Sequence, residues 1–331
     1  MKSQYEKKRL ITFDRIKIKS NYKYLLATKV KFNEMFHSRS GERIGIFYSS
    51  KDDINISYNL YIAVSYVKQT LTLEFSSKIL KEKYPDLISR DTIKECLTNI
   101  NQLNICEIDV DSILSNGAIT SVDVTYDANL ILSDNLLNVL NSQVNYRRFK
   151  WAHYDKEGIT FTKDVKSKDC TETITLYNKE KEICTSHNKD FLNSLSQPQS
   201  VIDYFKGKTR FEITLNTVKK IMNYLNLTDT KIFSVLNSDT NPILTQFDKV
   251  FGNSTANMPN TTFDDYENWA MKIILERYNG DLKLLEQDIR SKFNSRSGAS
   301  KRMKKFETVY HAMTSASTSE NPIEKIRNLL L

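Results

Sequence analysis

The sequence predicts an α+β protein made of antiparallel sheets flanked by helices. Four short segments alternate apolar and polar residues, and a strand turns successive side chains to opposite faces. Two of these segments lead directly into stretches with helical spacing of apolar residues. The chain has 331 residues, of which 40% are hydrophobic and 27% charged. This composition is typical of a folded protein with one large or two ordinary domains.

The first half of the chain predicts strands followed by helices. Residues 10–18 alternate in polarity, and strand-like runs follow at 43–48, 58–65 and 71–76. A helix is expected over 77–84, directly after the last of these strands. A second helix is expected over 92–101, where Ile93, Cys96, Leu97 and Ile100 share one face. We assign residues 1–117 to a first α+β subdomain.

The second half repeats this order. Strand-like segments occupy 118–127, 158–161, 173–178 and 210–215, and helices are expected around 136–140 and over 217–225. Residues 73–80 resemble 211–218, and residues 11–18 resemble 119–125. This similarity predicts a pseudo-repeat in which a second, catalytic subdomain (118–230) shares one pleated surface with the first. A chance similarity is the alternative.

The remaining residues, 231–331, predict a helical and basic region. Residues 251–262 read as a loop, and helices are expected over 266–278, 282–293 and 306–313. Residues 290–305 contain seven basic residues and no acid. We interpret this as a helix-turn-helix-like unit that contacts DNA through Arg296, Lys301, Arg302, Lys304 and Lys305. The alternative is a helical cap with a solvated basic face.

A second basic stretch, residues 146–156, interleaves cations with aromatic side chains. Arg147, Arg148, Lys150 and Trp151 are its candidate DNA-binding residues. Such a mixture suits a groove that neutralises phosphates and stacks on bases. A strand with a basic outer edge would have the same composition. The net charge of +8 also favours a polyanionic partner, although only weakly.

The polar sides of the four alternating strands carry the candidate chemistry. If the strands share one sheet, its polar face collects Glu74, Asp123, Asp127, Tyr177, Arg210 and Glu212. The carboxylates Asp123, Asp127, Glu212 and Glu74 are candidate ligands for Mg²⁺ or Mn²⁺, which prefer oxygen donors. Glu74 is the weakest candidate, since it could be the counterpart in an inactive half. A half-solvated antiparallel sheet without a site is the simpler alternative.

Tyr177 is the candidate nucleophile for a phosphodiester. A phenol is unreactive at its ordinary pKa of about 10, so nearby positive charge must favour the phenolate. Lys179, Lys181 and Arg210 could supply that charge. The alternatives for the nucleophile are Tyr154 and Tyr204. Glu182 is either a further metal ligand or a salt-bridge partner for a nearby lysine.

Several enzyme classes lack their motifs in this sequence. It contains no Gly-x-x-x-x-Gly-Lys-Ser/Thr, no Gly-x-Gly-x-x-Gly, no Gly-x-Ser-x-Gly and no His-Glu-x-x-His. ATP-driven helicase work, dinucleotide binding, serine hydrolysis and zinc-peptidase chemistry are therefore not expected. No apolar run approaches the ~18–20 residues that span a bilayer. A cytoplasmic location in a bacterial host, without a membrane partner, is the expectation.

Several motifs, in this order, resemble those of rolling-circle replication initiators. Residues 175–182, Thr-Leu-Tyr-Asn-Lys-Glu-Lys-Glu, resemble the Tyr-Asp/Asn-Lys-x-x-Glu strand of that family. Residues 209–214 resemble its Arg-x-Glu strand, and residues 121–127 resemble its strand with two aspartates. Residues 71–79 and 279–302 resemble segments of the filamentous-phage type, which is similar to plasmid initiators and related relaxases.

The resemblance implies an enzyme that nicks one origin strand, stays attached through a tyrosine, and leaves a 3′-OH to prime replication. It implies a divalent metal, and origin DNA, duplex and single-stranded, as partner. It also raises a host helicase, a host polymerase and a homodimer as partners. Two departures stand out: the superfamily's pair of histidines flanking a hydrophobic residue is missing, and position 120 is Thr where a basic residue is usual. Carboxylates would then have to supply the metal ligands.

Two rival hypotheses fit the same sequence. A non-catalytic origin-binding initiator or repressor would keep the basic surfaces without a tyrosine beside carboxylates. A structural or RNA-binding protein would leave the carboxylate face merely solvated. Metal-dependent DNA cleavage separates the first rival from the nicking enzyme, and salt-sensitive preference for origin duplex counts against the second.

Overall fold

The computed structural model describes residues 10–145, 148–154, 158–163, 165, 172–251, 263–278, 281–292, 295–316 and 322–331. These residues fall into two compact units. The first unit comprises the described residues up to Ser133, those from Arg148 to Val250, and Leu330–Leu331. The second comprises the described residues between Asp134 and Arg147 and between Phe251 and Leu329.

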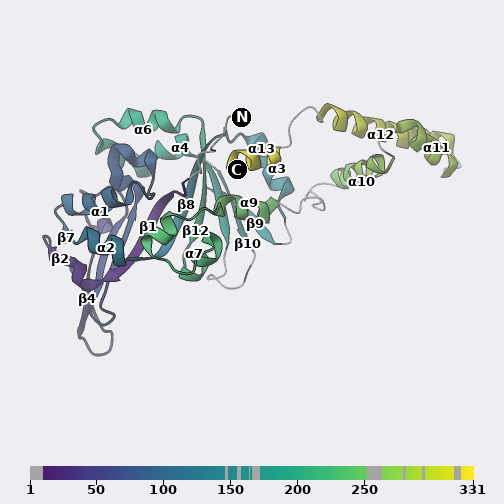
Figure 1. Ribbon diagram of the computed structural model, residues 1–331. Helices are drawn as coiled ribbons and strands as arrows, with labels where there is room; N and C mark the ends of the chain where they lie inside the picture. Colours follow the sequence, from purple (N-terminus) through teal and green to yellow (C-terminus); the bar gives the residue numbers. More distant parts are fainter. Residues whose placement is uncertain are drawn as a thin grey trace, which may run out of the picture. The chain divides into compact units, whose positions relative to one another are not determined.

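The first unit is built on a ten-stranded sheet in which all neighbours run antiparallel (Figure 1). The strand order is β3-β4-β5-β6-β1-β8-β12-β11-β10-β9. The strands are β1 (Phe13–Asn21), β3 (Asn33–Phe36), β4 (Arg43–Ser49), β5 (Leu60–Ser65), β6 (Thr70–Ser76), β8 (Ala118–Asn129), β9 (Phe149–Tyr154), β10 (Gly158–Lys163), β11 (Thr173–Asn178) and β12 (Lys208–Leu215). The four strands with polar faces all lie in this sheet, as predicted, and the α+β class is confirmed.

The strand order is the same when it is read from either edge. Strands β1, β6, β5, β4 and β3 from the first half correspond in place to β8, β12, β11, β10 and β9 from the second. The two halves meet at the antiparallel pair β1–β8, where Arg15 lies opposite Asp123. Glu74 of β6 lies opposite Lys17 of β1, and Glu212 of β12 lies opposite Thr125 of β8. The two glutamates thus hold equivalent places beside the central pair.

The apolar sides of the central strands form the core. Fully buried residues alternate along each strand, for example Leu71, Leu73 and Phe75 in β6. Helices α2 (Val110–Asn116), α7 (Val218–Leu225) and α8 (Ile232–Leu236) pack against β1, β8 and β12. Their own buried residues, such as Ile113, complete this core.

A second, smaller cluster involves helices beside β12. It contains Tyr84, Ile183, Phe191, Leu195, Val201 and Phe205. They come from η3 (Ser77–Asp86), α4 (Lys179–Ile183), α5 (Lys189–Asn193), α6 (Pro198–Phe205) and the turn after α5. The helix predicted over 77–84 lies within η3, which is a kinked 3-10 helix. Lys81 adopts a positive φ of 55°, which interrupts the regular helical hydrogen bonding, and Pro85 lies near its end.

The remaining described elements of the first unit are η1 (Tyr22–Tyr24), β2 (Leu25–Thr28), η2 (Ser50–Asp52), α1 (Ile93–Gln102), β7 (Cys106–Ile108), η5 (Ser186–Asn188) and, except for its last residue, α9 (Pro242–Phe251). The helix α3 (Asp134–Gln143) and, except for its last residue, the helix α13 (Pro322–Leu330) belong to the second unit. The helix α1 buries the four residues predicted to share its inner face. Most of the loop predicted over 251–262 lies outside the described residues. None of the described helices is long and apolar enough to cross a membrane.

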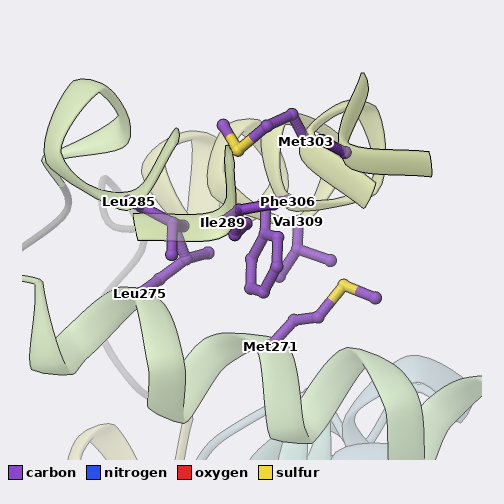
Figure 2. Packing of buried hydrophobic residues seen from close by; sticks show 8 residues of the cluster. Met271, Leu275, Leu285, Ile289, Met303, Phe306 and Val309 are labelled. Atoms are coloured by element: carbon purple, nitrogen blue, oxygen red, sulfur yellow. The ribbon is translucent and has the colours of Figure 1, made fainter. Parts of the chain in front are cut away.

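Three of the described helices of the second unit share a hydrophobic core. They are α10 (Phe263–Arg277), α11 (Leu282–Lys292) and α12 (Arg296–Ala316). Figure 2 shows side chains from all three converging; the cluster is Met271, Leu275, Leu285, Ile289, Ala299, Met303, Phe306 and Val309. The predicted final helix at 306–313 begins earlier, at Arg296, so most of the basic stretch is helical. We call α10–α12 the three-helix cluster.

Candidate active site

A row of paired residues crosses the second half of the sheet. Tyr154 of β9 lies opposite Gly158 of β10, which lies opposite Tyr177 of β11. Tyr177 in turn lies opposite Arg210 of β12, and Arg210 lies opposite Asp127 of β8. Directly paired residues project from the same face of an antiparallel sheet. The register therefore gathers two tyrosines, a cation and a carboxylate from distant segments.

Arg210 anchors this row through a buried ion pair. Its side chain has no exposed surface, and its Nε and Nη2 donate to the two Asp127 oxygens at 2.7 and 2.8 Å. Nη1 donates to the Tyr84 hydroxyl at 2.9 Å and lies 3.3 Å from an Asp14 oxygen. Such bidentate pairs fix geometry as well as charge. Arg210 is thus held in place by residues of both halves of the sheet.

The Tyr177 phenol is enclosed and faces a carboxylate. Tyr177 is 4% exposed, and its hydroxyl donates to Glu212 Oε2 at 3.4 Å, a long hydrogen bond. Burial, with the charge of Glu212, raises the pKa of this phenol well above its usual value. In this arrangement Tyr177 is therefore protonated at neutral pH, and Glu212 is placed to accept its proton.

Tyr154 is the accessible member of the row. It is 36% exposed, and its ring centroid lies 5.0 Å from that of Tyr177. The two rings flank Gly158, where a Cβ atom would come within 2.6 Å of the Tyr177 Cα. A glycine is thus required for this close approach. Tyr204, the other alternative nucleophile, is 39% exposed and carries the Lys208 ammonium 3.2 Å from its ring centroid.

Glu212 differs from the other carboxylates of the face. Burial and the charges of Asp123 and Asp14 raise its pKa to about 8. Among the described residues, no Lys or Arg forms an ion pair with it. A carboxyl with a pKa near neutrality is suited to general acid–base catalysis.

Lys179 supplies a second buried cation. It is 1% exposed, and its ammonium lies 5.3 and 5.7 Å from the ring centroids of Tyr84 and Tyr177. Burial and the positive charge of Arg210 lower its pKa, against the opposite effect of its ion-pair partner Glu182. Of the two roles considered for Glu182, the structure shows the salt bridge. Lys181 is exposed on α4, where its backbone N–H donates to Asn178 Oδ1 at 2.9 Å.

Three of the four predicted metal ligands are held by cations. Arg15 lies 2.7 Å from both Glu74 and Asp123, Lys17 lies 3.0 Å from Glu74, and Arg210 holds Asp127. Throughout the described part of the chain, no group of three or more His, Cys, Asp or Glu side chains is arranged to hold a metal ion. The residues as arranged do not fit a carboxylate metal centre, because basic side chains of β1 bind Glu74 and Asp123, and Arg210 of β12 binds Asp127.

Sequence reasoning missed the residues that come from β1 and η3. Asp14, Arg15 and Lys17 follow one another along β1, and the alternating, basic pattern of residues 10–18 was their available signal. Tyr84 had no such signal, since it reaches Arg210 from a kinked 3-10 segment distant in sequence. The same segment provides Lys78, whose Nζ donates to Asn188 Oδ1 at 2.6 Å.

The predicted DNA-binding residues lie at two places. On the edge strand β9 and just before it, Arg148, Lys150 and Trp151 are exposed, whereas Arg147 lies outside the described residues. Lys150 and Tyr154 project from one face, and Trp151 packs edge-on against His153 on the other. On α12, the predicted residues Lys301, Arg302, Lys304 and Lys305 are exposed. Arg296 begins α12, but its side chain is outside the described set.

Residues 87–234 match a family model that describes the N-terminal part of a phage replication-associated protein. The resemblance to phage rolling-circle replication initiators is thereby confirmed over this part of the chain. The matched residues contain β8, β11 and β12, and hence Asp127, Tyr177, Lys179, Arg210 and Glu212. They do not contain β1, Glu74 or the three-helix cluster. No curated protein and no solved structure matches the chain.

Proposed function

We propose that this chain, whose central residues match the phage replication-associated family, initiates rolling-circle replication by nicking one DNA strand through a covalent tyrosine link. The family match supports the role as initiator. The observation that carries the nicking activity is the Tyr177 hydroxyl donating to Glu212 within the matched region. A nucleophile with a hydrogen-bonded base is the usual requirement for covalent catalysis.

In the proposed reaction, the Tyr177 oxygen attacks a backbone phosphorus. The bond from the phenol oxygen to phosphorus forms, the bond from phosphorus to the 3′-oxygen breaks, and the phenol proton passes to Glu212. The leaving 3′-oxygen takes a proton from water and becomes the 3′-OH that primes synthesis. The phosphotyrosine bond conserves the energy of the broken phosphodiester for later resealing. The positive charges of Arg210 and Lys179 stabilise the negative charge that develops on the phosphate oxygens in the transition state.

The edge strand β9 is the proposed approach for single-stranded DNA. Tyr154 and Lys150 are exposed on the same face of this strand and can offer stacking and phosphate contact. Because Tyr154 packs on Tyr177, the scissile phosphate reaches Tyr177 only if the Tyr154 ring moves aside. The exposed Tyr154 is accordingly the alternative nucleophile.

A requirement for Mg²⁺ or Mn²⁺ stays a prediction. The proposed bond changes at phosphorus involve no metal, since Glu74, Asp123 and Asp127 are engaged with cations as arranged. Strand separation needs an energy source that the sequence motifs do not provide, so a host helicase and polymerase are the proposed partners. These roles would place the protein in the cytoplasm of a bacterial host. A homodimer is not required by any step.

The test uses purified protein and supercoiled DNA from its own replicon, with Mg²⁺, Mn²⁺ or EDTA. Wild type is compared with Tyr177→Phe, Tyr154→Phe and Tyr204→Phe. We expect nicking with a protein–DNA adduct that Tyr177→Phe abolishes and Tyr204→Phe retains. Loss in Tyr154→Phe alone would move the nucleophile to the exposed tyrosine. Activity that persists in EDTA would contradict the metal prediction.

The second candidate is a non-catalytic origin-binding initiator. It is favoured by one observation, the burial of the Tyr177 phenol, which disfavours the phenolate. Specific binding to origin DNA, without nicking by wild type under any of the three metal conditions, would establish this second function.

A further inference from the structure

The three-helix cluster has one helix whose two sides differ sharply. Ala299, Met303, Phe306 and Val309 of α12 point into the cluster's core, as Figure 2 shows for the last three. A helix turns about 100° per residue, so the opposite side of α12 is formed by Ser297, Lys301, Lys304 and Thr308. All four of these residues are exposed. We call them the outward face of α12.

The charges of the cluster are distributed unevenly. Two basic residues of α11 are paired within the helix: Arg290 lies 2.6 Å from Glu286, and Lys292 lies 2.7 Å from Asp288. Lys305, beside the outward face, is likewise held by Glu267 at 2.8 Å. Lys301 and Lys304 form no ion pair with any residue in the described portion of the structure. Their charges are therefore left to attract an anion.

The first turn of α12 is also open to an approaching anion. Ser295 caps the helix by accepting a hydrogen bond from the Gly298 N–H at 3.3 Å. At Gly298, an added Cβ would have no neighbour within 4 Å except the Ser295 side chain, at 3.7 Å. Backbone N–H groups at a helix start favour negative charge. The N-terminal half of α12 therefore carries both this favourable field, at its first turn, and the two unpaired lysines, Lys301 and Lys304.

We propose that the three-helix cluster is a duplex-DNA-binding module whose outward α12 face lies along the phosphates of the major groove. The proposal deepens the initiator function by adding a duplex contact outside the matched residues 87–234. The occupant follows from shape and charge, because one α-helix fits the major groove and lysines neutralise phosphates.

Two other polyanions fit this face less well. Binding of single strands relies on aromatic platforms, and the outward face consists of two serine or threonine hydroxyls and two lysines. A membrane surface requires an apolar side free to insert, whereas the apolar side of α12 is buried against α10 and α11. The face therefore favours duplex DNA over both.

The test measures duplex binding by the full-length chain. Lys301→Ser/Lys304→Ser is compared with wild type and with Lys272→Ser/Lys283→Ser, which removes the same charge from exposed positions of α10 and α11. Fluorescence anisotropy with a 5′-labelled duplex of about 30 base pairs, one turn being 10–10.5, gives the affinity over a range of salt concentrations. A single strand of equal length and anionic phosphatidylserine vesicles serve as further ligands.

We expect the outward-face variant to bind duplex roughly 10- to 30-fold more weakly near 0.15 M salt, with a salt slope about 2 smaller, since each phosphate contact contributes about 0.9. The α10/α11 variant should bind like wild type. Equal losses in the two variants would overturn the proposal, as would a loss confined to single strands or vesicles. If wild type does not nick DNA but the two variants still differ in duplex binding as expected, the proposed nicking activity is wrong and the proposed duplex-binding role of the three-helix cluster stands.

Discussion

Glu74 and Glu212 hold equivalent places in the two halves of the sheet, yet their surroundings are electrostatically opposite. Burial acts to raise the pKa of Glu74, but hydrogen bonds and charges from Lys17 and Arg15 outweigh it and lower the pKa. Burial and the charges of Asp123 and Asp14 raise the pKa of Glu212 to about 8. One glutamate is therefore a fixed anion in an ion-pair cluster, and the other can exchange a proton near neutral pH.

Two equivalent positions of β1 and β8 carry different residues, and these differences account for the opposite pKa shifts of the two glutamates. Lys17 lies opposite Glu74, whereas the equivalent position opposite Glu212 is Thr125. Arg15, which binds Glu74, occupies the place on β1 that Asp123 occupies on β8. The second half thus lacks two cations and gains one anion. The strand framework is shared, so the chemical difference between the halves comes from the side chains of β1 and β8.

The largest expected effect is on the nicking rate, which should depend on Glu212 and not on Glu74. Glu212→Gln removes the proposed proton acceptor for Tyr177 and should lower the nicking rate by ~10²–10⁴-fold, the usual contribution of a general base. In wild type the rate should rise with pH through about 8, as the Glu212 carboxyl loses its proton. The measurement is the initial nicking rate from pH 6 to 9.

Glu74→Gln is the matched control, because it makes the same change at the equivalent position. It should leave both the rate and the pH profile within a few-fold of wild type. If the two variants lose activity equally, the halves do not differ in function, and the assignment of Glu212 as base is wrong.

The sequence predicted the local part of this site and not its long-range part. Alternation along residues 121–127, 173–178 and 210–215 was enough to place Asp127, Tyr177 and Arg210 on one polar face. It could not show that β1 would lie between β6 and β8, because strand order depends on contacts between distant segments. Without that order, Glu74 and Asp123 read as free metal ligands, whereas Arg15 binds both. Tyr84 could not be found either, since a kink at Lys81 sets the path of its segment.

A second comparison concerns the stability of the two arginine–aspartate pairs. Arg210 is fully buried with Asp127, whose side chain is 3% exposed, whereas the side chain of Arg15 is 25% exposed. Arg210→Met should lower the free energy of unfolding by about 3–5 kcal/mol, because it leaves a buried carboxylate unpaired. Arg15→Met should cost about 1 kcal/mol, since water screens its partners. Denaturant unfolding followed by circular dichroism measures both; similar costs would mean that burial does not distinguish the pairs.

The smallest expected effect is the pH dependence of stability, which should have opposite signs at the two glutamates. The folded-state pKa of Glu212 is about 8, above its usual 4.5, so the folded chain holds a proton that the unfolded chain releases. The free energy of unfolding should therefore fall by about 2 kcal/mol from pH 6 to pH 8, and Glu212→Gln should remove that fall.

The control is Glu74, whose pKa is lowered. Its contribution to the free energy of unfolding is present above its usual pKa and is lost as the pH drops through the folded value. Glu74→Gln should accordingly lose stability at neutral pH without flattening the fall between pH 6 and 8. Unfolding curves at pH 5, 6, 7 and 8 test this, and an unchanged fall in Glu212→Gln would show that another group controls it.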